Sequence, residues 1–147
     1  MRTTWILLAG VLTACGGSTD PETPPIVSPA ADAVVDIRAP AEVTLAIGQS
    51  IRLQDPDLRI LFEAVPEDSR CPTDVVCVWA GDARMAFQAS GGADRRFSLH
   101  LPTEQVGPAS MDIGGYRIEV TQLSPEPVTF KPNAPERYRA TLVIRRL

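Results

Sequence analysis

The chain has 147 residues, with 14 basic side chains, 18 acidic side chains and a single histidine. This length is typical of one domain. The acidic balance argues against nucleic acid or an anionic membrane as the main partner.

The first residues, MRTTWILLAGVLTAC, indicate an exported protein. Arg2 gives a positive start, and the apolar run from Trp5 to Leu12 is shorter than the about 20 apolar residues that cross a bilayer, as in a signal peptide. The run ends in LTAC, residues 12–15, which resembles the lipobox of bacterial lipoproteins. The resemblance implies that residues 1–14 are removed and that Cys15 is acylated. Gly16 stands where an Asp often retains such proteins in the inner membrane, which favours the outer membrane. The alternative is an ordinary secretory signal with an unmodified cysteine.

Residues 16–33, GGSTDPETPPIVSPAADA, contain four prolines and mostly small or polar side chains. This composition predicts a flexible tether between Cys15 and a folded domain over residues 34–147. Without residues 1–14 the chain has 13 basic and 18 acidic side chains, a net charge of −5.

Apolar and polar residues alternate with a period of two through most of residues 34–147. The alternation predicts strands over residues 43–47, 60–64, 85–89, 97–101, 116–120 and 138–145. Each strand has one apolar face and one mostly polar face, as half-buried antiparallel strands require.

Glycine-containing breaks separate these strands. Gly48-Gln49, Gly81-Asp82 and residues 90–94 are expected to close hairpins, and Gly114-Gly115 to form a turn or a bulge, because glycine accepts positive φ. The proline-rich segment 124–136 is expected to cross from one sheet to the other. Together these features predict an all-β fold, a single antiparallel β-sandwich of about seven or eight strands, immunoglobulin-like or similar. A small β-barrel is the alternative.

Cys71 and Cys77 lie in the stretch DSRCPTDVVCVWAGDARM, residues 68–85. They are the cysteines left besides Cys15, and an even pair in an exported protein predicts a disulfide. Closing a loop of about seven residues stabilises a fold by roughly 2.4 kcal/mol. Redox centres usually have C-x-x-C spacing, and zinc needs about four ligands, so a structural disulfide is favoured. We expect a single helical turn from Pro72 and Trp79 packed beside the disulfide.

The same stretch carries a resemblance. DSRCP at residues 68–72, Cys77 and WAG at residues 79–81 are similar to a motif of uncharacterised secreted proteins and lipoproteins of bacteria. The resemblance extends from about residue 51 through residues 116–118 and 125–127 to the strand at Tyr138. It implies a disulfide-stapled β domain and supplies no catalytic residue.

The sequence predicts no catalytic, cofactor or metal site. His100 is expected to face outward on its strand, and no G-x-S-x-G elbow or phosphate-binding glycine loop is present. Acids that fall mostly in turns are candidates for glycosidase carboxylates or for calcium ligands, but without the spacing of known calcium loops. They are Asp55, Asp57, Glu67, Asp68, Asp74 and Asp82.

Arginines lie on the outward faces of the predicted strands. If those strands are neighbours, they form an arginine-rich face that binds an anionic glycan or a lipid headgroup. The alternative is a solvated face with cross-strand ion pairs to Glu119 and Asp112. The candidate residues are Arg84, Arg96, Arg117 and Arg139, with Arg137 and Arg145 beside them.

These features predict a non-enzymatic lipoprotein of the outer membrane or cell envelope. Its β domain, facing the periplasm or the cell surface, binds an envelope protein or glycan partner or has a structural role. The alternative is an inhibitor-like module that presents the 68–82 disulfide loop to an enzyme such as a protease. A protruding, stiff loop with exposed apolar residues favours the inhibitor-like module. A deep pocket with converging titratable groups favours a third function, a hydrolase of unrecognised type.

Overall fold

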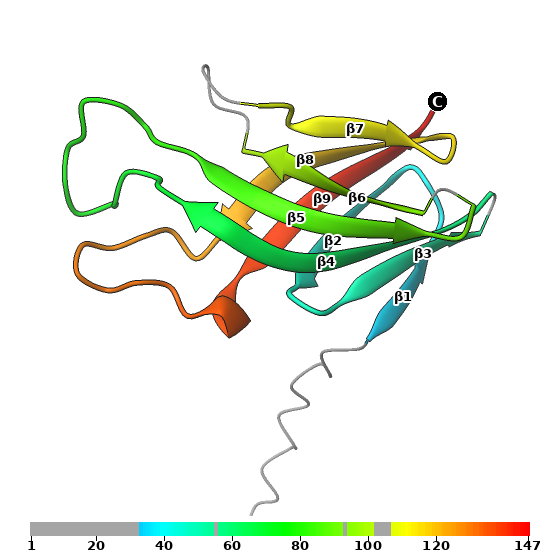
Figure 1. The fold of residues 1–147 in the computed structure, drawn as a ribbon, viewed down its shortest axis with the longest axis horizontal. Helices are drawn as coiled ribbons and strands as arrows, with labels where there is room; N and C mark the ends of the chain where they lie inside the picture. Colours follow the sequence, from blue (N-terminus) through cyan, green and yellow to red (C-terminus); the bar gives the residue numbers. More distant parts are fainter. Residues whose placement is uncertain (1–32, 55, 93, 102–106) are drawn as a thin grey trace, which may run out of the picture.

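The computed structural model describes residues 33–54, 56–92, 94–101 and 107–147. Cys15, the predicted signal peptide and nearly all of the predicted tether lie outside the described residues. Within them the chain forms nine strands and one short 3₁₀ helix (Figure 1). In chain order these are β1 (Val34–Ile37), β2 (Ala41–Ala46), β3 (Ser50–Gln54), β4 (Asp57–Asp68), β5 (Ala83–Ser90), β6 (Arg95–His100), β7 (Ser110–Ile113), β8 (Tyr116–Ser124), η1 (Pro135–Arg137) and β9 (Arg139–Arg146).

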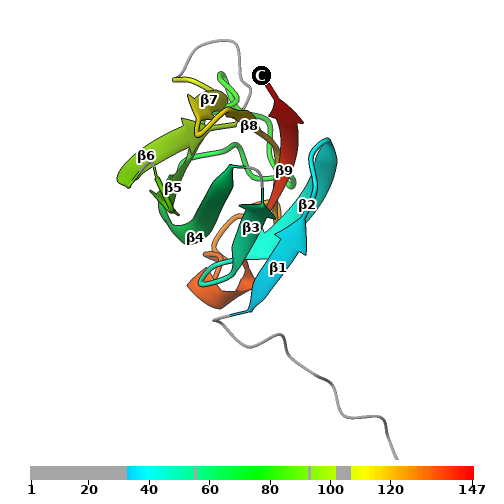
Figure 2. The same cartoon turned by 90° about the vertical axis from the view of Figure 1, so that its right-hand side faces the viewer.

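The strands form two sheets that face each other. One sheet has the order β1-β3-β4-β5-β6 and the other has the order β2-β9-β8-β7. Figure 2, a view along the strands, shows the two sheets as facing layers, and the buried apolar side chains form one core. Because the two sheets stay separate, the predicted β-sandwich is confirmed and the fold is not the closed barrel that was the alternative.

The core follows from the alternation of apolar residues along the strands. In β5, Ala83, Met85, Phe87 and Ala89 are buried, and the residues between them are partly exposed. Phe87 also pairs across the sheet with a phenylalanine on each neighbouring strand. Its ring centroid lies 5.2 Å from that of Phe62 and 5.6 Å from that of Phe97. Burial of each such side chain contributes about 1.5–3 kcal/mol, so this row is a main source of stability. The facing sheet covers it with Ile118, Val120, Leu142 and Ile144, all fully buried.

The pairing departs from the prediction in one place, because β1 runs parallel to β3. Residues 38–40 take the chain from β1 into the other sheet, where β2 pairs with β9. The turn at Gly48-Gln49 then returns it to the first sheet as β3. Two changes of sheet in succession bring β3 beside β1 in the same direction. The prediction that Gly48-Gln49 closes a hairpin was therefore wrong.

The connection between β8 and β9 is a second correction. These strands are antiparallel neighbours in one sheet, so residues 125–138 do not cross between sheets. They form a long loop that extends from one end of the sandwich. The predicted turns at residues 90–94 and at Gly114-Gly115 do join adjacent strands. Gly114 and Gly115 have φ of 58° and 80°, the backbone of a two-residue hairpin turn.

Candidate functional site

Two long loops extend side by side from the same end of the sandwich. The first, called here the disulfide loop, is residues 69–82 between β4 and β5. The second, the proline-rich loop, is residues 125–138 between β8 and β9. Figure 1 shows them as the green and orange loops at the left.

The base of the disulfide loop continues the pairing of β4 with β5. The Ser69 amide donates to the Asp82 carbonyl at 2.7 Å, and the Cys71 amide donates to the Ala80 carbonyl at 2.8 Å. Gly81 has φ of +71°, and a Cβ added there would lie 1.9 Å from the Ser69 carbonyl oxygen. Only glycine therefore fits between the two sides of the base. The prediction that Gly81-Asp82 closes the hairpin was therefore wrong: Gly81 lies at the base of the loop and lets its two sides approach each other.

The predicted disulfide is present. Cys71 and Cys77 are bonded, with their Cα atoms 5.9 Å apart. The chain reverses between them in a turn in which the Val75 amide donates to the Pro72 carbonyl at 3.3 Å, close to the helical turn expected from Pro72. Because the disulfide closes this turn, the end of the loop has little conformational freedom to lose on binding.

Arg70 connects the disulfide loop to the proline-rich loop. Its guanidinium is buried and forms a bidentate pair with Asp68, with Nε–Oδ1 at 2.7 Å and Nη2–Oδ2 at 2.8 Å. It also donates to the carbonyls of Leu123 at 2.7 Å and Pro125 at 2.9 Å, and to Glu126 at 3.3 Å. A buried charge is tolerated only when it is paired and its N–H groups are hydrogen-bonded, and this guanidinium meets that condition.

Asp68 accepts a further hydrogen bond from the Tyr138 hydroxyl at 2.9 Å. Burial raises the pKa of Asp68, but the bonds from Arg70 and Tyr138 outweigh it and hold the pKa below its ordinary value. Burial and the Asp68 carboxylate both raise the pKa of Tyr138. Asp68 is therefore ionised throughout the neutral range, and the Arg70 charge is matched by a buried carboxylate.

A second group of hydrogen bonds joins the two loops further out. The Thr73 amide donates to the Pro127 carbonyl at 3.0 Å. The Asp74 carboxylate accepts from the Thr129 amide at 2.9 Å and from the Thr129 hydroxyl at 3.0 Å. These bonds lower the pKa of Asp74. The two loops thus form one joined projection from base to end.

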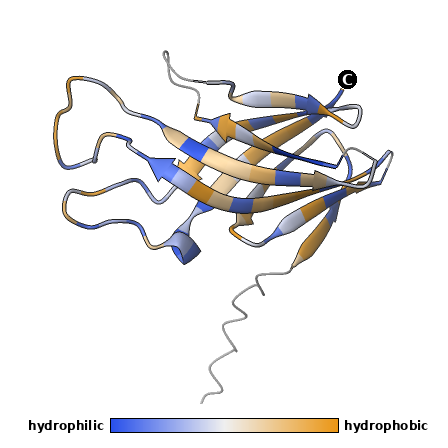
Figure 3. Ribbon diagram, viewed as in Figure 1, coloured by the Kyte–Doolittle hydropathy of each residue, from blue (hydrophilic) through white to orange (hydrophobic). Residues whose placement is uncertain are grey.

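The outer end of this projection is apolar. Six apolar side chains, called here the apolar tip, are exposed there, and Figure 3 shows hydrophobic residues at the ends of both loops. They are Val75, Val76, Val78 and Trp79 on the disulfide loop and Val128 and Phe130 on the proline-rich loop. Trp79 is 76 % exposed, so the prediction that it packs beside the disulfide was wrong. Sequence analysis also missed the part of the tip on the proline-rich loop. The sequence feature that could have indicated it is the apolar pair Val128 and Phe130, separated by Thr129, within a polar, proline-rich segment.

The arginine-rich face predicted from the sequence is not present as one surface. Arg84 and Arg96 lie on β5 and β6 of one sheet, whereas Arg117 and Arg139 lie on β8 and β9 of the other. The structure instead agrees with the alternative, in which arginines form ion pairs across strands. The ion pairs are Arg84–Glu67, Arg96–Glu63, Arg117–Asp112 and Arg145–Glu119, and Arg139 donates to two backbone carbonyls.

His100 is not the exposed strand residue expected from its position. Its Nδ1 is hydrogen-bonded to Oδ2 of Asp82, and both side chains are largely buried. Gly107 packs on the imidazole ring so closely that a Cβ there would lie 2.2 Å from it. The pair ties β6 to the base of the disulfide loop. None of the hydrogen bonds in the described part of the chain joins His100 to a hydroxyl or thiol nucleophile.

The acids predicted as candidate calcium ligands do not gather on one rim. Asp57 pairs with Arg52, Glu67 with Arg84 and Asp68 with Arg70, Asp74 binds Thr129, and Asp82 binds His100. Asp55 lies outside the described residues. Among the residues that the structure describes, no three carboxylate, histidine or cysteine groups could hold a metal ion.

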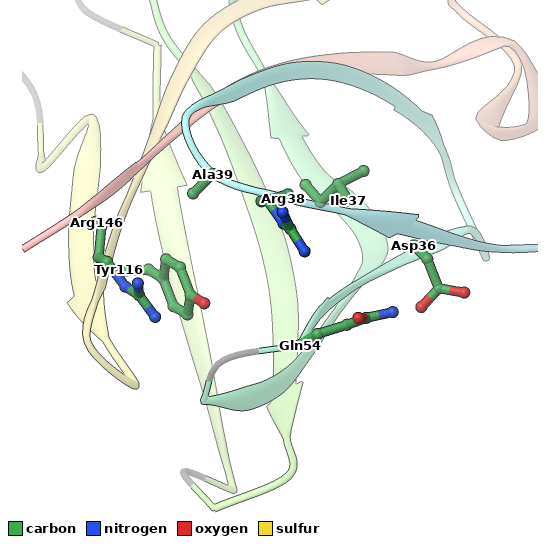
Figure 4. A pocket seen from close by; sticks show the side chains of 7 residues that line it. All are labelled: Asp36, Ile37, Arg38, Ala39, Gln54, Tyr116 and Arg146. Atoms are coloured by element: carbon green, nitrogen blue, oxygen red, sulfur yellow. The ribbon is translucent and has the colours of Figure 1, made fainter.

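Figure 4 shows the side chains that line a pocket of about 650 Å³. They lie at or next to the ends of β1, β3 and β9 and the start of β8, so the pocket is at the opposite end of the strands from the two loops. It is lined by Asp36, Ile37, Arg38, Ala39, Gln54, Tyr116 and Arg146. A single carboxylate, from Asp36, lies among these residues, so this pocket does not present the facing carboxylates of a glycosidase.

Comparison with models of protein families, with curated proteins and with solved structures finds no match for this chain. In the residues described here, no helix has the length and apolar character needed to cross a membrane.

We predict that Arg70→Met destabilises the fold by about 3–5 kcal/mol, because it leaves the Asp68 carboxylate buried without its partner. The matched control is Arg117→Met. Arg117 forms the same bidentate pair with Asp112 in an exposed position, and exposed pairs contribute at most about 1 kcal/mol. Denaturant unfolding of both variants measures the difference. Equal losses would show that burial of the Arg70 pair adds nothing.

We also predict that the contribution of Asp68 disappears in acid. Its folded pKa lies below the ordinary value of 3.8, so its stabilising effect is complete above that value and is lost as pH falls through the folded pKa. The difference in unfolding free energy between the native chain and Asp68→Asn should be large at about pH 6 and should shrink towards about pH 2. Denaturant unfolding across this range tests it. A difference in unfolding free energy that does not change with pH would contradict the conclusion that Asp68 is ionised in the folded protein.

Proposed function

We propose that the chain is a cell-envelope lipoprotein, held in the outer membrane through an acylated Cys15, and that its β-sandwich is a non-enzymatic binding module. The lipobox-like LTAC after a short apolar run supports the anchor. The apolar tip is the binding surface. This assignment replaces the arginine-rich face, whose arginines are divided between two sheets.

One observation carries the assignment of the binding surface. Val76, Val78 and Phe130 are almost fully exposed, and Trp79 nearly so, on two loops that are held rigidly beneath them. Apolar side chains gathered on a surface mark interaction sites, because water disfavours them and nothing in the fold covers them. The rigid base means that binding orders few additional residues, so more of the burial energy becomes affinity.

A more specific alternative is an inhibitor-like module. The disulfide and the hydrogen bonds of the loop base hold residues 72–79 as a protruding turn. A turn held in this way fits the substrate cleft of an enzyme such as an endopeptidase. Inhibition of a purified endopeptidase by the native chain, lost in Trp79→Ser, would support this alternative. Binding through the tip without any inhibition would exclude it for the enzymes tested.

We predict that Cys15 carries the lipid. Metabolic labelling with a fatty-acid probe should mark the native chain, and Cys15→Ser should abolish the label, because the thiol is the only attachment point that the lipobox resemblance implies. Cys71→Ala/Cys77→Ala is the matched control and should be labelled like the native chain. Equal labelling of Cys15→Ser would overturn the anchor.

We predict that the apolar tip contacts the partner in cells. A photoreactive phenylalanine analogue at Val76 in the full-length chain should give covalent adducts on illumination, because this side chain faces solvent. The same analogue at Glu42, an exposed residue on edge strand β2, is the control and should give far fewer adducts. Adducts are read by mass spectrometry. More adducts from position 42 than from position 76 would contradict the assigned surface.

A further inference from the structure

Phe130 has a backbone conformation that its side chain does not favour. Its φ is 59°, and among the residues that the structure describes it is the one non-glycine residue with a positive φ. It lies in a tight turn that the Lys131 amide closes by donating to the Val128 carbonyl at 3.1 Å. Glycine or asparagine normally occupies such a position, because a Cβ is strained there. The fold gains nothing in return, since the Phe130 ring is fully exposed. Strain of this kind gathers at functional sites, which points to a role in binding.

Several polar side chains near the tip are already used in hydrogen bonds between the two loops. Asp74 accepts from Thr129, and Thr73 donates both its amide and its hydroxyl to the Pro127 carbonyl. The Arg70 charge is matched by Asp68 and Glu126. A protein interface typically forms about one hydrogen bond per 100–200 Å². With these groups turned inward, the tip offers mainly hydrocarbon and aromatic surface, which a lipid layer accepts without hydrogen bonds.

The shape and charge of the tip agree with a lipid partner. The apolar side chains project outward from the loop ends, and neither of the two described pockets is lined by them. Residues 71–82 contain no arginine or lysine, residues 125–134 contain only Lys131, and without residues 1–14 the chain has a net charge of −5. Attraction to an anionic surface is therefore not the source of binding. An exposed tryptophan beside aliphatic side chains suits the headgroup region of a bilayer.

The length of chain before the domain brings such a surface within reach. This step rests on the proposed anchor at Cys15. The 18 residues from 16 to 33 span at most about 60 Å when fully extended. A compact domain of about 115 residues is roughly 35 Å across. The tether can therefore let the tip reach the membrane that carries the anchor. Tethering also raises the effective concentration, so a weak apolar contact is enough.

We propose that the apolar tip inserts into a zwitterionic lipid surface, and that Phe130 on the proline-rich loop is inserted together with Trp79 on the disulfide loop. The two loops then act as a second membrane contact beside the lipid anchor. They set which end of the sandwich faces the bilayer, and the end that holds the pocket lined by Gln54 and Tyr116 faces away from it.

The test uses the mature chain, residues 15–147, with Cys15→Ser so that no lipid is attached. Trp79 is its only tryptophan, because Trp5 lies in the removed segment. Addition of phosphatidylcholine vesicles should shift the Trp79 emission to the blue, and the chain should sediment with the vesicles. Phe130→Gly should weaken this partitioning about tenfold, because one aromatic side chain is lost from the inserted surface. Its melting temperature should be equal or higher, since glycine relieves the strain.

Leu147→Ser is the matched control, because Leu147 is an exposed apolar residue at the end of the chain, after β9 and away from the two loops. It should leave partitioning unchanged. Absence of partitioning, or equal effects of Phe130→Gly and Leu147→Ser, would overturn the lipid proposal. Binding only to phosphatidylglycerol vesicles with steep salt dependence would overturn the apolar mechanism. Protein adducts at position 76 in cells without vesicle binding would leave the tip as the binding surface and replace lipid by a protein cleft. If the chain neither binds vesicles nor gives adducts at position 76 in cells, the proposed function is overturned as well.

Discussion

The end of the sandwich that carries the two loops depends on one buried guanidinium. Arg70 is fixed by the Asp68 carboxylate on its own side and by the carbonyls of Leu123 and Pro125 on the other loop. Its planar fork of donors binds a carboxylate and two carbonyls at once, which a lysine ammonium does not reproduce in this geometry. Because removing any partner leaves a buried charge or a buried donor unsatisfied, the two loops keep one relative position.

The strands were largely predictable from sequence, and their arrangement was not. Six strands follow from alternation of apolar and polar residues, which reports directly on a sheet with one buried face. β1, β3 and β7 are short, with four or five residues each, and too few alternations to stand out. Alternation also predicts that Arg84 and Arg117 point outward, but it does not predict which sheet each residue belongs to. That depends on where the chain changes layers, and the proline-rich segment suggested a change that does not occur.

The site was predictable only in part, for a physical reason. The compartment and the spacing of Cys71 and Cys77 were enough to predict their disulfide. Nothing in the sequence shows that Thr73 meets Pro127 or that Arg70 reaches Leu123, since these pairs are more than 50 residues apart in the chain. Such contacts depend on the strand order, which makes the β4–β5 and β8–β9 connections leave the same end of the sandwich. Trp79 was expected to pack beside the disulfide, but the loop that carries it projects beyond both sheets and has no layer to cover it.

Stability and binding are separated along the length of the projection. At its base, the Arg70 pair and the close approach at Gly81 make replacement costly, and further out the disulfide closes the turn that carries the tip. At its end, Val76 and Phe130 have almost no covered surface, so their replacement removes little that holds the fold together. Selection for stability alone would favour polar side chains at the end and glycine at position 130. The chain instead has apolar side chains and a strained phenylalanine there. Contact of these side chains with a partner outside the fold best explains their presence.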